Sequence, residues 1–179
     1  MAATVKVWDR PVRLLHWSLA GSVAFCWLTA DESRNLHEVA GYLAAALIGA
    51  RLVIGMVGTR YARFSQFIRS PQQTLLYAGD LMRHKELRYL GHNPLGAAMV
   101  VLLLSMVGGI GLTGWMQTTD TYWGVQWVEE THEALAQLLL VAISLHVAGV
   151  IHASLRHHEN LVLAMITGQK RTPAEGDIV

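Results

Sequence analysis

Four stretches of about twenty mainly apolar residues constrain the fold of this chain more than any other feature. They cover residues 12–29, 37–57, 94–116 and 131–151. A helix of about 20 residues is long enough to cross the hydrocarbon core of a bilayer. The chain is also 53% hydrophobic and only 15% charged, a low charged fraction for a water-soluble domain. The sequence therefore predicts an all-α, integral membrane four-helix bundle.

The length of 179 residues predicts a single domain. No small-residue cleavage site follows the stretch 12–29, so we interpret it as an uncleaved membrane anchor. The only cysteine, Cys26, excludes an intrachain disulfide and covalent haem attachment through Cys-x-x-Cys-His. The polar tail 168–179 is expected to be disordered.

Basic residues are distributed unequally between the two sides of the predicted membrane. One side holds both termini and the loop 58–93, with twelve of the fourteen Lys and Arg residues. The other side holds only Arg34, beside the acidic residues Asp31, Glu32, Asp120, Glu129 and Glu130. The positive-inside rule therefore places both termini in the cytoplasm. The net charge of +1 gives no indication of a nucleic-acid partner.

The loop between the second and third stretches is predicted to contain one or two short cytoplasmic amphipathic helices, interrupted at Pro71. Apolar residues recur there at helical spacing among arginines, at Phe64, Phe67, Ile68, Leu75, Leu76 and Leu81. Such helices lie along a membrane surface with their apolar face against the lipid. Their charges are expected to face headgroups and solvent rather than a substrate.

Two histidines share one face of the last apolar stretch. His132 and His146 are fourteen residues apart. Fourteen steps of roughly 100° end about 40° short of four turns, with an axial separation of about 21 Å. An ionisable residue inside a membrane span is a functional-site hypothesis by default. The shared face is long enough to carry one metal macrocycle near each side of a bilayer.

Depth along the predicted helices sorts four histidines into two layers. His16 lies early in the first stretch and His146 late in the last, which runs the opposite way, so both reach the inner half. His37 and His132 begin the second and fourth stretches on the outer side. Two imidazoles that face each other across a gap provide the ligation of six-coordinate haem iron. The pattern predicts an inner pair, His16 with His146, and an outer pair, His37 with His132.

Small residues lie beside these histidines. Gly41 is four residues after His37, and Gly149 is three residues after His146, so each glycine shares a face with its histidine. A small side chain lets a porphyrin lie close to the backbone. Small residues also mediate plain helix packing in membranes, and that alternative stays open.

Two arginines are candidate partners of haem propionates. Arg51 lies fourteen residues after His37, on nearly the same face and at the depth of the inner pair. Arg13 lies three residues before His16. A propionate would satisfy each guanidinium through charge-assisted hydrogen bonds. The alternative for both is a side chain that snorkels to the inner interface.

The histidines have other interpretations as well. His37 and His132 also fit capping or headgroup contacts, and His16 also fits a snorkelling side chain. His152, six residues after His146, is a rival ligand on a different face. The remaining histidines fall in segments expected to be aqueous, and no ligand role is assigned to them: His84, His92, His157 and His158.

Five segments that span residues 7–170 carry a resemblance to a known family: WDRPVRLLHW, HEVAGYLAAALIGARLVIG, GHNPLGA, THEALAQLLLVAISLHVAGV and ENLVLAMITGQK. They resemble the bacterial cytochrome b561 family, which includes small quinone-linked cytochromes and the cytochrome b subunits of nickel-iron hydrogenases. The resemblance implies a four-helix bundle in the bacterial inner membrane with two non-covalent haem b groups. The family's ligand pattern falls on the same four histidines.

The resemblance implies a dihaem b-type cytochrome that carries electrons between a redox partner and membrane quinone, ubiquinone or menaquinone. Family members serve hydrogenases, other dehydrogenases, c-type cytochromes and superoxide oxidation, so the partner is left open, as is whether the chain is part of an enzyme. Its compact length resembles the small members more than the longer hydrogenase subunits. A partner such as a c-type cytochrome or a dehydrogenase subunit is expected, besides membrane lipid.

Two alternatives remain. The first is a haem-binding membrane anchor subunit of a larger oxidoreductase complex. The second is a metal-ion transporter lined by these histidines, although the spans lack the Gly/Pro-broken half-helices and intramembrane acids typical of transporters. The outer loop 117–130, which has no Lys or Arg, is either a docking surface for a positively charged partner or a consequence of membrane topology.

Overall fold

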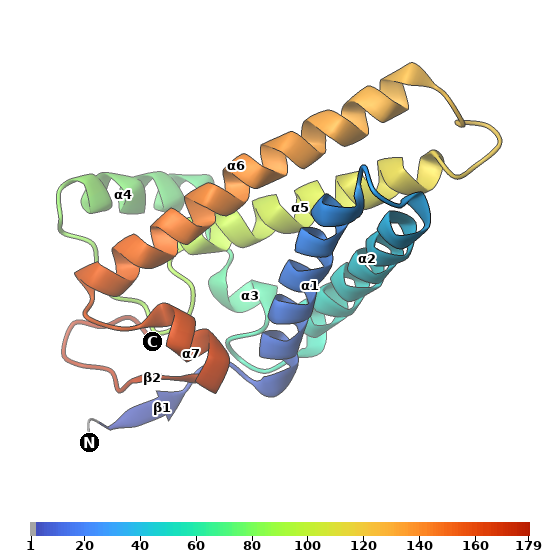
Figure 1. The fold of residues 1–179 in the computed structure, drawn as a ribbon. Coiled ribbons are helices and arrows are strands. Elements are labelled where there is room, and N and C mark those ends of the chain that lie inside the picture. Colours follow the sequence, from blue (N-terminus) through green and yellow to red (C-terminus); the bar gives the residue numbers. More distant parts are fainter. Residues whose placement is uncertain (1–2) are drawn as a thin grey trace. The chain divides into compact units, whose positions relative to one another are not determined.

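The computed structural model describes residues 3–179, and most of them are helical (Figure 1). In chain order the elements are β1 (Thr4–Lys6), α1 (Arg10–Thr29), α2 (Arg34–Val57), α3 (Phe64–Phe67), α4 (Pro71–Met82), α5 (Pro94–Met116), α6 (Gln126–Arg156), α7 (Leu161–Thr167) and β2 (Gln169–Arg171). The predicted helical class is confirmed. One small addition is an antiparallel pairing of β1 with β2, in which Val5 lies opposite Lys170.

Three of the described helices, α2, α5 and α6, are long and apolar enough to cross a membrane. They contain the predicted stretches 37–57, 94–116 and 131–151, and α6 extends beyond its stretch at both ends. The stretch 12–29 lies within α1, a helix of 20 residues that begins with two arginines in its first turn. Its passage through the membrane remains a prediction.

Polar side chains mark where several helices begin. At the start of α5, the Asn93 side-chain oxygen accepts a hydrogen bond from the backbone N–H of Gly96 at 2.7 Å. Ser70 caps α4 in the same manner. Pro71 then occupies the first helical position, where its missing N–H costs nothing. The two short helices predicted between the second and third stretches are therefore present as α3 and α4.

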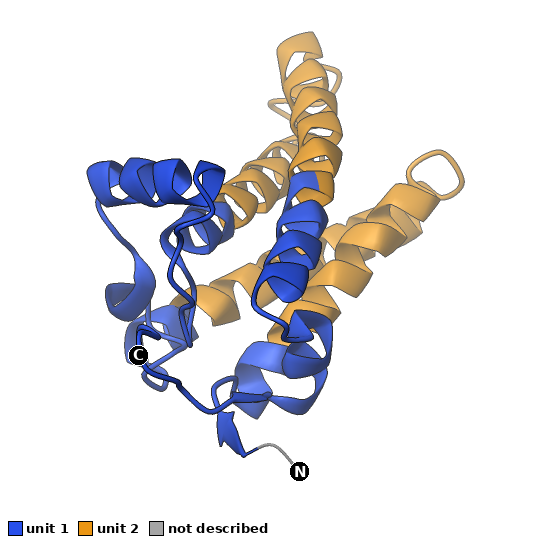
Figure 2. Ribbon diagram, turned by 90° about the vertical axis from the view of Figure 1, so that its left-hand side faces the viewer, with its two compact units in different colours: residues 1–13, 53–101, 145–179 blue, residues 14–52, 102–144 orange. Residues whose placement is uncertain are grey.

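The described chain divides into two compact units (Figure 2). Unit 1 comprises Met1–Arg13, Val53–Val101 and Leu145–Val179, and unit 2 comprises Leu14–Leu52 and Leu102–Ser144. In unit 2, segments of α1, α2, α5 and α6 contribute to one apolar cluster, with buried Ala44, Ile48, Val107 and Leu139. In unit 1, the buried cluster consists of Val7, Trp8, Val12, Ala62, Leu90 and Ala164.

The C-terminal tail is ordered within unit 1, so the expectation of a disordered tail at 168–179 is wrong. Gly168 ends α7 with φ +84°, and its carbonyl oxygen accepts hydrogen bonds from the N–H groups of Val7 and Trp8. Further on, the N–H of Ile178 donates to the carbonyl of Arg88 at 2.8 Å. The polar composition was misleading because these partners lie far away in the sequence.

Candidate functional site

His37 and His132 lie close together within unit 2. His37 occupies the first turn of α2 and His132 the second turn of α6. Their ring centroids are 6.1 Å apart, with the ring planes at 68°. Both residues are half-buried. The structure thus brings together the two histidines of the predicted outer pair, while their role as ligands stays a prediction.

Both rings are oriented by backbone carbonyl groups of neighbouring helices. Nδ1 of His37 lies 2.9 Å from the carbonyl oxygen of Cys26 on α1. Nδ1 of His132 lies 3.1 Å from the carbonyl oxygen of Ile110 on α5. A carbonyl oxygen can only accept, so each Nδ1 carries the proton and donates it. In a neutral imidazole this leaves the Nε2 lone pair for a metal, the arrangement found around metal-bound histidines.

Two residues of α5 shape the surroundings of His132. Thr113 Oγ1 lies 3.1 Å from the same Nδ1 and donates to the carbonyl of Gly109 at 3.0 Å. A Cβ atom at Gly114 would lie 3.1 Å from Cε1 of His132, so the glycine lets α5 approach the ring. Neither residue was predicted from the sequence. The run GGIGLTG at 108–114 was an available signal for such a close approach.

The separation of the two rings fits an iron atom between them. Metal–imidazole bonds are about 2 Å long. Two such bonds, plus the distance from each Nε2 to its ring centre, come close to the 6.1 Å between the centroids of His37 and His132. At Gly41, one turn after His37, an added Cβ would meet no atom within 4 Å. The ring separation, the orientation of both rings and this open space suit axial ligation of a planar cofactor.

Arg51 lies on α2, in the same unit as His37 and His132. It is only 9% exposed, which is rare for an arginine. A guanidinium at this depth in a membrane requires a compensating charge or hydrogen-bond acceptors. Its pairing with a haem propionate stays a prediction.

His16 and His146 lie in different units, His16 in unit 2 and His146 in unit 1. Both are half-buried, and the ring of His16 packs edge-on against Trp17 with centroids 4.9 Å apart. Their pairing around an inner haem remains a prediction. Gly149 is exposed, and an added Cβ there would meet no atom within 4 Å. Packing within the protein therefore does not require a glycine at that position.

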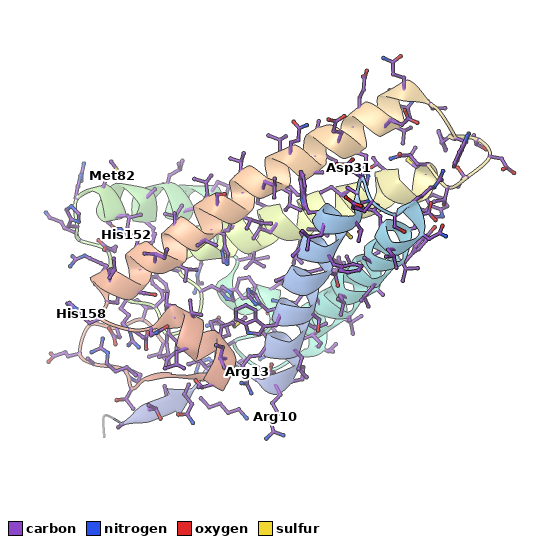
Figure 3. All side chains as sticks on the ribbon, in the orientation of Figure 1. Arg10, Arg13, Asp31, Met82, His152 and His158 are labelled. Carbon is purple, nitrogen blue, oxygen red and sulfur yellow. The ribbon has the colours of Figure 1, made fainter. Side chains whose placement is uncertain are left out.

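Arg13 contacts the end of α7 within unit 1. Its Nη1 donates to the carbonyl oxygen of Ile166, and its Nε lies 3.2 Å from where a Cβ on Gly168 would be. Arg13 therefore fastens the start of α1 to α7 (Figure 3). This structural role was not predicted, and a role beside a propionate stays a prediction.

Two further histidines differ in their surroundings. His92 contacts the rings of Trp8 and Phe67, with centroid separations of 4.8 Å and 4.5 Å. In the turn before α5 its half-buried ring packs against aromatic side chains, and whether this segment is aqueous stays a prediction. His152, the rival to His146, is exposed on α6 (Figure 3).

A buried charge network, which the sequence did not reveal, lies in unit 1. The Arg88 side chain is 4% exposed and donates to Asp177 and, at 2.8 Å and 3.3 Å, to both carboxylate oxygens of Glu159. The Lys170 ammonium donates to the carbonyl oxygen of Leu90 at 3.0 Å and lies 3.3 Å from Glu159. Two cations and two carboxylates thus compensate one another and hold the tail against the loop before α5.

The network shifts the pKa values of its carboxyl groups. Burial alone would raise the pKa of Glu159, but the hydrogen bonds from Arg88 and the charge of Lys170 hold it below its ordinary value. For Asp177, burial is likewise outweighed by hydrogen bonds from the Ala174 N–H and Arg88, and its pKa is lowered. Both groups therefore remain ionised at neutral pH.

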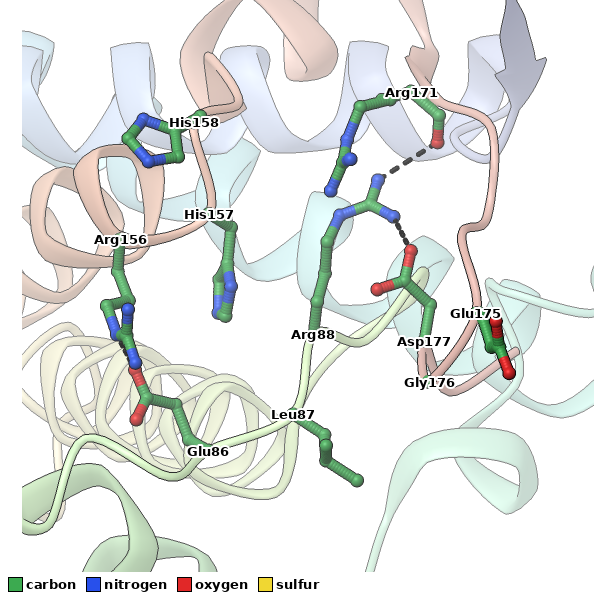
Figure 4. A pocket seen from close by; sticks show the side chains of 10 residues that line it. All are labelled: Glu86, Leu87, Arg88, Arg156, His157, His158, Arg171, Glu175, Gly176 and Asp177. Carbon is green, nitrogen blue, oxygen red and sulfur yellow. Dashed lines mark hydrogen bonds and ion pairs between the residues drawn. The ribbon is translucent and has the colours of Figure 1, made fainter.

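The network borders a cavity of about 310 Å³ in unit 1 (Figure 4). Its ionisable lining comprises Glu86, Glu175, Asp177, Arg88, Arg156, Arg171, His157 and His158. Glu86 is buried and accepts a hydrogen bond from Arg156 at 2.8 Å. Because three acids face three arginines, the cavity has no clear preference for an anion or a cation.

Comparisons with known proteins identify one family. The model for the family described as prokaryotic cytochrome b561 matches residues 7–168. A relative named probable Ni/Fe-hydrogenase B-type cytochrome subunit, from Bradyrhizobium diazoefficiens, is 22% identical over 214 aligned residues that cover 94% of this chain and 86% of the relative. No solved structure matches. The range matched by the family model contains all four histidines of the two predicted layers.

Proposed function

The chain belongs to the prokaryotic cytochrome b561 family, and from this premise we propose that it is a dihaem membrane cytochrome that carries electrons between a redox protein and the quinone pool. Family membership implies haem b binding, and the family together with the apolar helices identifies a multi-pass membrane protein. Beyond this, we propose the number of haems, the residues that bind them, the use of quinone and the identity of the redox partner.

The outer pair of histidines carries this proposal. His37 and His132 come from helices far apart in the sequence, yet their ring centroids are 6.1 Å apart and each Nδ1 meets a backbone carbonyl. A plain interfacial histidine has no need of a second imidazole at this distance. We assign His37 and His132 to one haem, and His16 and His146 to the other.

A bound haem b supplies a one-electron couple between ferric and ferrous iron. His37 with His132, and His16 with His146, would each hold one iron, so the iron would change its charge without exchanging a protein ligand. The carbonyl groups of Cys26 and Ile110 hold the outer rings in place. Apolar side chains of α1, α2, α5 and α6 keep water away. Arg51 is assigned to balance a propionate.

We propose that α1 is the fourth span of a four-helix bundle, with both termini in the cytoplasm of a bacterium. The proposed partner is a nickel–iron hydrogenase, because the relative's name assigns it to such an enzyme. The inference from compact length towards the small quinone-linked members carries less weight, since the chain covers 86% of that relative. Electrons would pass to or from ubiquinone or menaquinone.

Haem content and redox titration of the purified chain test this function. Two acid-extractable haems per chain are expected. His37→Ala and His132→Ala should each remove the same redox component, and His16→Ala and His146→Ala the other. His152→Ala, on the exposed side of α6, is the matched control and should keep both. One haem per chain, or separate components lost on changing His37 and His132, would contradict the assignment.

A further inference from the structure

The short helix α4 carries apolar side chains on two opposite faces. Tyr77 is buried, and its ring meets that of Tyr89 edge-on at 5.7 Å, which fixes one face to unit 1. Burial, together with the charge of Glu86 and the neighbouring Tyr89, raises the pKa of Tyr77 to about 12, so this contact stays uncharged. Leu75 and Met82, seven residues apart and on the other face, are 73% and 83% exposed.

Other exposed apolar residues lie near Leu75 and Met82 along the chain. Leu76 is 63% exposed, and Ile68 and Leu87, just before and after the helix, are about half exposed. Figure 1 labels α4, and Figure 3 shows Met82 at the end of this helix. Large apolar side chains left exposed on a short helix indicate an interaction site rather than a solvated surface.

Basic residues stand at both ends of α4. Arg69 precedes the helix, and Arg83 and Lys85 follow it, all exposed. Asp80 is the one acidic residue of the helix. Apolar side chains flanked by cations match a bilayer surface, where acyl chains accept the leucines and anionic headgroups attract the arginines and lysine.

The connections of α4 keep it close to such a surface. Thirteen residues separate it from the end of α2, and eleven separate it from the start of α5. Both α2 and α5 are long and apolar enough to cross a membrane. Connections of this length allow α4 to lie in the headgroup layer beside the ends of both spans.

We propose that the outer face of α4, formed by Leu75, Leu76 and Met82, docks together with the preceding Ile68 on the anionic phospholipid surface of the adjoining leaflet, with Arg69, Arg83 and Lys85 at the headgroups. This surface is separate from the haem ligands, and its lipid binding does not depend on the proposed electron transfer. Coverage by another protein, or by a second copy of the chain, is an outcome that the test detects.

A spin label at Leu75→Cys in the full-length holoprotein tests the docking. Cys26 is left unchanged because it contacts His37; the unmodified chain is treated with the label in parallel, and any signal from Cys26 is subtracted. The protein is placed in nanodiscs of phosphatidylcholine, with or without phosphatidylglycerol. With phosphatidylglycerol, the label should be accessible to oxygen and shielded from a water-soluble nickel chelate. A label at Asp80→Cys, on another exposed side of α4, should show the reverse.

Neutralising the cations tests the role of the headgroups. Arg69→Gln, Arg83→Gln and Lys85→Gln together should cancel the effect of phosphatidylglycerol on the label at position 75, while the haem spectrum confirms folding. A label that is equally accessible to the nickel chelate at positions 75 and 80 would overturn the proposal. Shielding of the label at position 75 from both reagents would indicate that a protein covers the helix, and would also overturn the proposal. So would accessibility to oxygen that changes neither with phosphatidylglycerol nor with the triple substitution.

Discussion

Nδ1 of His132 on α6 lies 3.1 Å from the carbonyl oxygen of Ile110 on α5. The acceptor is a backbone atom, so a side-chain substitution at Ile110 does not remove it. The bond fixes the tautomer of the imidazole and leaves the Nε2 lone pair available to a metal. His37 has the same relationship to the carbonyl of Cys26. The orientation of the proposed outer ligands therefore depends on how closely the helices approach.

Gly114→Val should abolish the outer haem. A Cβ at position 114 would already lie 3.1 Å from the His132 ring, and the two methyl groups of valine would force α5 and α6 apart. Haem per chain should fall from two to one, with the other redox component retained. Gly108→Val is the matched control, because a Cβ there would meet no atom within 4 Å. Equal effects of both changes would contradict a specific role for Gly114.

Arg51→Gln should lower the reduction potential of the inner haem. A nearby positive charge stabilises the more negative, ferrous state, so its removal favours the ferric state. The outer haem should change little. In Arg51→Lys, which keeps the charge, the reduction potential of the inner haem should lie between that of Arg51→Gln and that of the unmodified chain. An unchanged inner potential at full haem content would favour a guanidinium that simply reaches the interface.

Glu159→Gln should loosen the C-terminal tail. Arg88 and Lys170 would lose their shared carboxylate in a buried setting, where Arg88 is only 4% exposed. Removing one partner of a buried ion pair costs about 3 to 5 kcal/mol. Hydrogen exchange of the amides at 169–178 should accelerate. Glu175→Gln, at an exposed position of the same tail, is the control. Equal exchange in both variants would leave the network without a stabilising role.

The same network predicts a pH dependence. Because the pKa values of Glu159 and Asp177 are lowered in the folded state, their contribution is present above the ordinary carboxyl pKa. It is lost as the pH falls through the lowered values, so protection of the tail amides should decline below about pH 4. In Glu159→Gln the decline should be smaller. Protection that falls instead near neutral pH would point to histidines.

The sequence predicted the long helices from hydropathy. It also predicted the meeting of His37 with His132, because each lies near the start of a span that begins on the same side of the membrane. It did not predict Thr113 or Gly114, since the residue that faces a ring depends on how far one helix is shifted along its neighbour. The sequence also failed to predict that the C-terminal tail, residues 168–179, is structured. Asp177 looks like part of a solvated tail until its partner Arg88, 89 residues earlier in the chain, is known. Lys170 likewise looks solvated until its contacts with Glu159 and the carbonyl oxygen of Leu90 are known.

The side of unit 2 that we propose to face outward carries several exposed acids, and its one arginine already has partners. Arg34 pairs with Glu38 at 2.7 Å and lies over the ring of Trp123 at 4.0 Å. Asp120, Glu129 and Glu130 are exposed and belong to the same unit as His37 and His132. Such a surface favours a positively charged redox partner, whereas acids that only follow membrane topology have no partner to attract.

Salt and charge reversal separate these two interpretations. If the partner docks by charge, electron transfer should slow as ionic strength rises, because exposed charges are screened over about 8 Å at physiological salt. Asp120→Lys together with Glu129→Lys should slow transfer while both haems remain. Thr121→Lys, which adds a charge to the same loop without removing an acid, should have a smaller effect. If the electron-transfer rate changes neither with salt nor with charge reversal, docking by charge at this loop is excluded. Electrons would then be exchanged at the cytoplasmic face or with quinone.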